Sequence, residues 1–324
     1  PKPARGGSAK LHHQQGHDPK VRHAKDVIVG ELAIPGQWIV ATVETNSFWP
    51  VTAQKVAFRG QTIWIIPLME GHYPAVAIAR PSGLHAKECE RLLMRFLSAL
   101  SWAERRGFLV LSIGESSRPQ PRTRRDPFGM SICETFSLVY LPEPQDERAM
   151  LALALMREGR GLNHPGYAFL SFFRVLEAAL PDASKRVAWI GSQLDCLQDR
   201  EAVRAIAKLK EAGVDDIGVH LWNARRSAMA HAKSDPIIDP DDPSQAREVE
   251  ADLPIISALA ERAIEEVLGV ETFWTVYDKH LYELSGFREI LGEELIRVIL
   301  QDETLVEERM VEMPTIKVVS LMVV

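Results

Sequence analysis

Two hydrophobic patterns divide the chain. In roughly the first 140 residues, short runs rich in β-branched and aromatic residues are separated by turn residues, which is typical of strands. These strand-like runs are 37–43, 62–66, 75–78, 108–113 and 136–140. Between them, apolar residues recur at helical spacing from Ser82, the expected N-cap, to Gly107, the expected C′ residue. The pattern predicts an α+β domain with a mainly antiparallel sheet and one helix packed on it.

After Pro142-Glu-Pro144 the pattern becomes almost purely helical. Pro165, preceded by Asn163 or His164, is placed to open a helix that Pro181 ends. The sequence Asp242-Pro-Ser-Gln245 is a capping box for a last long helix, which contains Pro254. The expected helices are 146–157, 165–180, 185–197, 200–212, 215 or 216 to 232, and 243–268.

These patterns predict four parts. The first is a flexible arm, because 1–25 is rich in Gly, Lys, His and Gln and has no hydrophobic period. An α+β domain over 26–143 and a helical bundle over 146–268 follow, with a hinge at 141–145. The C-terminal extension 269–324 has no clear pattern, and its end, 315–324, is β-prone, so it is either an added strand or an aggregation hazard.

Composition and charge narrow the function. The chain has 46% hydrophobic and 25% charged residues, which excludes a disordered or fibrous protein, and its net charge of -6 argues against a general polyanion binder. No apolar run approaches the roughly 18 residues of a membrane span, and the start has no secretory h-region. The three cysteines are far apart and predict neither disulfides nor a zinc site. The cysteine pattern favours a reducing cytoplasm, and the lack of an apolar span predicts no membrane contact. We expect no metal and no cofactor, because nucleotide-binding and metalloprotease motifs are missing.

The segment 216–232 carries the candidate chemistry. On an α-helix, His220, Ser227 and His231 fall on one stripe, with Asn223 and Arg226 beside it. An Arg and a His near a helix end can hold a phosphodiester, with the Arg stabilising charge and the His moving a proton. The same residues also fit a structural role, either as a buried polar network or with His231 interacting with the dipole at the C-terminal end of the helix.

Glu177 is the predicted partner of this segment. It lies on the otherwise apolar helix 165–180, and burying a carboxylate without a partner costs several kcal/mol. Arg225 or Arg226 is the nearest chemical match. We therefore expect Glu177 to face the helix that carries Arg226 and His231.

The segment Arg226-Ser-Ala-Met-Ala-His231 resembles the hallmark of HEPN domains, which is an Arg followed, after four to six residues, by a His. The family usually has Asn, Asp or His directly after the Arg, where Ser227 stands here. Tyr167 to Leu180 looks like the early HEPN helix, with its acidic residue at Glu177. The resemblance covers about 146–268 and implies an HEPN-like helical bundle that pairs with a second copy as a homodimer. It also implies a metal-independent endoribonuclease, in which His231 assists attack of the ribose 2′-OH and Arg226 neutralises the developing charge.

The whole chain is also similar to the MauJ family of methylamine-utilisation proteins. The similarity rests on the mixed N-terminal half followed by FLSFFRVLEAAL at 169–180 and NARRSAMAHA at 223–232. This resemblance implies a pathway and no particular reaction. The sequence thus leaves two hypotheses. One is an accessory protein of amine or one-carbon metabolism that acts by binding, with Asn223, Ser227, His220 and Glu177 as binding residues and RNA or a protein as partner. The other is the endoribonuclease.

Overall fold

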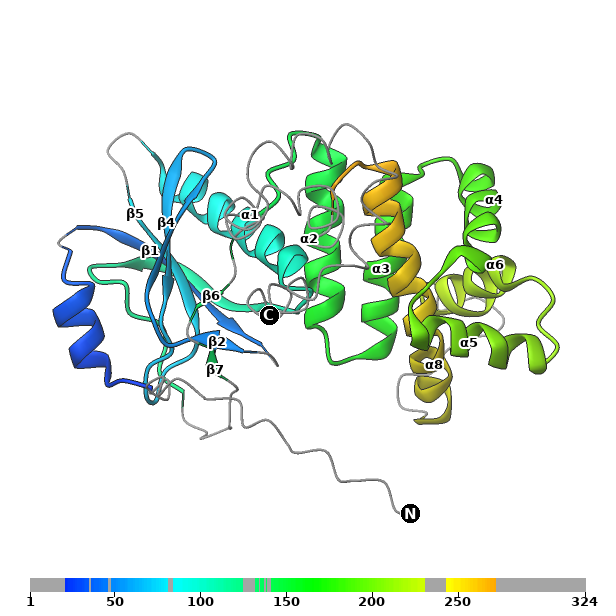
Figure 1. The fold of residues 1–324 in the computed structure, drawn as a ribbon, viewed down its shortest axis with the longest axis horizontal. Helices are drawn as coiled ribbons and strands as arrows, with labels where there is room; N and C mark the ends of the chain where they lie inside the picture. Colours follow the sequence, from blue (N-terminus) through cyan, green and yellow to red (C-terminus); the bar gives the residue numbers. More distant parts are fainter. Residues whose placement is uncertain are drawn as a thin grey trace, which may run out of the picture.

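The computed structural model describes residues 21–271 except 35, 46–47, 81–83, 125–131, 134, 137, 139–140 and 231–242. Within them the chain is α+β, with an antiparallel sheet in the N-terminal half and helices in the C-terminal half, as predicted (Figure 1). The arm up to residue 20, most of the extension 269–324 and the predicted cap Ser82 lie outside the described residues.

The sheet has five strands in the order β3-β4-β5-β1-β6, and every neighbouring pair is antiparallel. Its strands are β1 (Trp38–Glu44), β3 (Gln54–Phe58), β4 (Gln61–Ile66), β5 (Ala75–Ala79) and β6 (Leu109–Ser116). Two short strands, β2 (Trp49–Pro50) and β7 (Ile132–Cys133), pair in parallel beside it. The sequence analysis missed β3, whose alternating pattern is only five residues long and begins with two polar residues.

Both faces of the sheet are covered, which explains why β1 is buried from Trp38 to Val43. The helix α1 (Ala86–Ala103) packs Leu93 and Phe96 on one face. A π-helical segment, η1 (Lys25–Glu31), packs Val27 and Ile28 on the other. The sequence analysis predicted no helix here, because seven residues are too few to show a helical period.

Two predictions in the N-terminal half are wrong. At the predicted strand 136–140, the described Phe136 and Leu138 are not in a strand. Instead the Phe136 ring makes a T-shaped contact with Trp49 and fills the core beside α1. Gly107 is not the C′ residue of α1 either, because the residue with a left-handed backbone is Arg105, with φ 52°.

Gly107 has a different role, which is to let two backbones approach. A Cβ at this position would lie 2.2 Å from the carbonyl oxygen of Arg160, at the end of helix α2 (Glu147–Gly161). Only glycine permits such a distance without a shift of the chain. The C-terminal ends of α1 and α2 are thus held together.

The C-terminal half consists of helices with well-marked ends. Asp146, His164, Asp182, Asp199 and Asp216 each cap a helix by accepting a hydrogen bond from a backbone N–H. Pro165 opens its helix as predicted. After α2 the elements are α3 (Pro165–Ala179), α4 (Ala183–Gln193), η2 (Leu194–Cys196), α5 (Arg200–Glu211), α6 (Ile217–His220), η3 (Leu221–Ser227), α7 (Ala228–Ala230), α8 (Pro243–Arg262) and η4 (Ala263–Val267).

The helix α3 is central to this half. It lies against α2 and α8, and its Phe169, Phe173 and Leu176 are fully buried in one continuous core (Figure 1). The predicted capping residue Asp242 lies outside the described residues, but α8 begins at Pro243 and runs through Pro254. The packing of these helices sets the positions of the candidate site residues.

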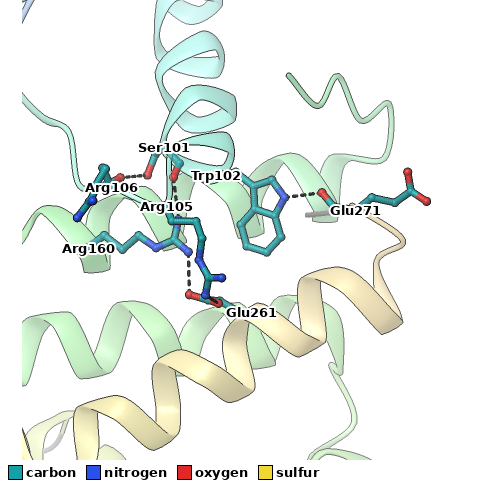
Figure 2. A network of polar contacts seen from close by, with 7 residues as sticks. All are labelled: Ser101, Trp102, Arg105, Arg106, Arg160, Glu261 and Glu271. Carbon is teal, nitrogen blue, oxygen red and sulfur yellow. Dashed lines mark hydrogen bonds and ion pairs between the residues drawn. The ribbon is translucent and has the colours of Figure 1, made fainter. Parts of the chain in front are cut away.

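A polar network joins the two halves where α1, α2 and α8 meet (Figure 2). The Arg160 side chain, 10% exposed, donates to the Ser101 carbonyl (2.7 Å) and pairs with Glu261 (2.8 Å). Arg105 binds the second oxygen of Glu261 at 2.5 Å, and Trp102 donates its indole N–H to the Glu271 carbonyl at 2.7 Å. Residues 141–145, the predicted hinge, have no regular secondary structure.

Candidate functional site

The segment 216–230 is one continuous helix with a change of register. Asp216 caps it by accepting from the Val219 N–H (2.9 Å), and α6 follows. From Leu221 to Ser227 the helix is π, with hydrogen bonds from i to i+5, and α7 ends the described part. The predicted stripe of His220, Ser227 and His231 assumed α spacing throughout, so it does not apply across the π segment.

The π register brings a histidine and an arginine to one carboxylate on α8. His220 and Arg225 are five residues apart, which in a π turn places them on the same side. Nε2 of His220 lies 2.9 Å and Nε of Arg225 2.6 Å from the same oxygen of Asp252, whose side chain is 3% exposed. Arg225 also reaches Glu248, one turn earlier on α8, at 3.3 Å. The sequence analysis missed Asp252, although it is a carboxylate on an apolar helix face, the same signal that marked Glu177.

The opposite side of the segment faces α3. Nη2 of Arg226 lies 3.0 Å from Oε1 of Glu177, so the predicted pairing of these residues is confirmed. The two side chains are 24% and 31% exposed, respectively. The Arg226 guanidinium also lies over the Trp222 ring, 4.9 Å from its centroid. Arg226 is thus held between a carboxylate and an aromatic face and still reaches solvent.

A second guanidinium, that of Arg186 on α4, lies near the same ring. It is 5.3 Å from the centroid of Trp222 and 5.8 Å from that of Phe173, and it donates to the Leu180 carbonyl at 2.7 Å. Burial lowers the pKa of Arg186, an effect that the nearby charge of Glu177 opposes. No sequence signal pointed to Arg186, because it follows Ser184 and Lys185 in what reads as a polar first helical turn.

The structure therefore separates residues that the sequence analysis grouped together. His220 binds a carboxylate of α8, whereas Arg226 binds one of α3. Asn223 is exposed and Ser227 is partly buried. His231, the predicted proton carrier, lies outside the described residues.

Two further findings concern metals and membranes. Within 21–271, apart from the gaps given above, no group of three or more His, Cys, Asp and Glu side chains is arranged to hold a metal ion. No helix in the same part of the chain is long and apolar enough to cross a membrane.

Comparison with known proteins gives one match. Residues 152–265, about a third of the chain, match the model of a family described as Methylamine utilization protein MauJ. The matched segment includes Glu177, Arg226 and Asp252, which means that both carboxylate sites lie within it. No curated protein and no solved structure matches the chain. For the helical half, the match supports the resemblance to the MauJ family that the sequence indicates.

Proposed function

We propose that this protein is a cytoplasmic accessory protein of methylamine utilisation and that its helical half acts by binding a partner, not by catalysis. The observation that carries the proposal is the match of residues 152–265 to the MauJ family, whose description names this pathway. The match includes the helices that hold the charged side chains of the candidate site.

The contacts of those side chains support a binding role. His220 and Arg225 are engaged with Asp252, a nearly buried carboxylate, and Arg226 is engaged with Glu177. Charged groups paired in this way hold helices in place and fix the shape of the surface around Asn223, which is exposed. A partner would then recognise that shape.

A growth experiment tests this role. The gene is disrupted in the source organism, and growth is compared on methylamine and on a substrate that does not require amine oxidation. We expect a defect on methylamine alone, which the wild-type gene restores. An Arg226→Lys variant should also restore growth, because lysine keeps the charge beside Glu177. Unchanged growth of the disrupted strain on methylamine contradicts the pathway.

A second candidate function is a metal-independent endoribonuclease. It is favoured by the partial exposure of the Arg226–Glu177 pair, since a guanidinium that reaches solvent is accessible to a phosphate. In this mechanism Arg226 stabilises the charge on the phosphate and His231 transfers the proton, in an HEPN-like homodimer that pairs two helical bundles.

The ribonuclease mechanism has its own test. Purified protein is incubated with single-stranded RNA in EDTA, and cleavage is compared for the wild type, Arg226→Ala and His231→Ala. The mechanism requires wild-type cleavage and a loss of about 10²-fold or more in both variants. Native mass spectrometry of the same samples reports whether the protein is a dimer. Absence of cleavage by the wild type excludes this candidate under these conditions.

A further inference from the structure

An arginine occupies an unusual backbone position in the sheet half, far from the site described above. The turn between β3 and β4 consists of Arg59 and Gly60, with φ values of 49° and 72°. Two-residue hairpins of this kind normally have Asn, Asp or Gly at the first position, because the left-handed conformation disfavours a Cβ. A strained residue of this type is a marker of function more often than an ordinary turn residue is.

The Arg59 side chain extends away from the sheet toward the helical half. Its Nη2 donates to the Pro144 carbonyl and lies 3.1 Å from the sulfur of Met150 on α2. Its backbone N–H donates to Glu143 at 3.1 Å. Arg59 therefore links the hairpin to the segment 141–145 and to α2.

A pocket of about 200 Å³, counted with the solvent at its mouth, lies beside this side chain. Its apolar wall includes Phe58, Met150 and Leu153, and its polar groups come from Arg59 and from Arg95 and Ser98 on α1. The hydroxyl of Ser98 donates to the Met94 carbonyl at 3.0 Å. The remaining polar side chains of the pocket wall are two guanidinium groups, those of Arg59 and Arg95.

These guanidinium groups have donors without acceptors. The Nε atom of Arg59 is buried and has no hydrogen-bond partner among the described residues. Arg95 has neither a hydrogen bond nor an ion pair within the same part of the chain. Burial lowers the pKa of Arg95, the charges of Arg59 and Arg91 lower it further, and Glu147 opposes them. The lining of the pocket thus includes two guanidinium groups and no carboxylate.

We propose that this pocket binds a small oxyanion, held by Arg95 and Arg59. A guanidinium presents parallel N–H donors that match two oxygens on one centre, as in a carboxylate or a phosphate. The pocket admits only a small ion, and its apolar wall suits a short alkyl group on a carboxylate. A bound oxyanion would lie between the hairpin of the sheet half and α2 of the helical half, next to 141–145. The proposal is independent of the proposed function, because it uses none of the residues at Glu177 or Asp252.

Thermal unfolding of the full chain tests the proposal. Midpoint temperatures are measured in potassium phosphate, potassium acetate and potassium chloride at matched ionic strength. We expect phosphate, acetate or both to raise the midpoint temperature by about 2 °C or more in a saturable way. Chloride should raise it much less. Phosphate alone would identify a phosphate site and acetate alone a carboxylate site, and either result supports the proposal.

Two variants assign the effect to the pocket. Arg95→Gln should remove most of the shift, whereas Arg91→Gln, at the exposed neighbouring cation on the same helix, should retain more than half of it. Arg95→Lys is used if Arg95→Gln does not fold. It keeps the charge but not the parallel donors, so it should weaken the binding of phosphate or acetate several-fold in calorimetric titration. An equal shift with chloride, or a wild-type shift in the Arg95 variants, overturns the proposal.

Discussion

Asp252 and Glu177 contact the same helical segment from opposite sides, yet their surroundings differ. Asp252 is 3% exposed, and one of its oxygens contacts both the Arg225 guanidinium and the His220 ring. Glu177 is 31% exposed and, among the described residues, accepts a hydrogen bond from Arg226 alone. A buried ion pair cannot lose one member without leaving an uncompensated charge, whereas an exposed pair is replaced by water at little cost. The difference assigns Asp252 to the stability of the fold, whereas the Arg226–Glu177 pair is accessible to solvent.

Removal of the Asp252 charge should have the largest effect. Asp252→Asn keeps the shape of the side chain but leaves Arg225 and His220 without their shared carboxylate. We expect a loss of about 3 kcal/mol or more in the free energy of unfolding, measured by urea denaturation.

Glu248 provides the control on the same helix. It also contacts Arg225, at 3.3 Å, but its side chain is exposed. Glu248→Gln should therefore change the free energy of unfolding by less than about 0.5 kcal/mol. If the two variants are equally stable, burial does not distinguish the two carboxylates and the comparison fails.

A third carboxylate, Glu104, extends the comparison to a group without a close cation. Among the described residues its side chain makes no hydrogen bond or ion pair, and burial raises its pKa to about 7, against the opposing charge of Arg106. Its pKa in the unfolded chain is near 4.5, so stability falls as the pH rises from about 4.5 to about 7, where the folded state must ionise the buried group. Glu104→Gln should therefore stabilise the protein by about 2 kcal/mol at pH 8 and have little effect at pH 4.5.

This prediction is checked by urea denaturation of both proteins across that pH range. Glu211→Gln, at an exposed position, controls for the loss of one negative charge. A Glu104→Gln variant that is no more stable than the wild type at pH 8 would show that the carboxyl is hydrated in the folded protein.

Apart from the Glu248 control, the smallest effect is expected at the Arg226–Glu177 pair. A double-mutant cycle with Arg226→Ala and Glu177→Ala should give a coupling energy of about 0.5–1 kcal/mol, because both side chains are partly exposed. Salt should reduce the coupling, since exposed charges are screened. A coupling energy well above 2 kcal/mol, insensitive to salt, would place this pair in the same class as Asp252.

The sequence predicted features whose causes are local. Pro165 and the capping aspartates mark helix ends because each acts on backbone groups within three residues of itself. Glu177 could be paired with an arginine because a carboxylate on an apolar helix face requires a cation. The general fold class followed from the change of period near residue 140.

What was missed depends on partners distant in the chain or on geometry without a sequence marker. Asp252 lies 32 residues from His220, and nothing in either local sequence specifies their contact. Arg186 becomes buried only because Trp222 and Phe173, from two other helices, cover it. The π register of 221–227 has no characteristic residue, and consequently the predicted stripe placed His220 and Arg226 on a common side.

The π segment has a consequence for changes in chain length. A stretch with i to i+5 hydrogen bonds contains one more residue than an α-helix needs to span the same hydrogen-bonded turn. Deletion of a single residue between Leu221 and Ser227 can therefore be absorbed by a return to α register, with the helix before and after it kept. If the residue is lost between His220 and Arg225, the two would be four residues apart in an α-helix, which keeps them on one face and within reach of Asp252. In this segment, a one-residue gap between related chains is therefore compatible with the same set of helices and the same contacts at Asp252.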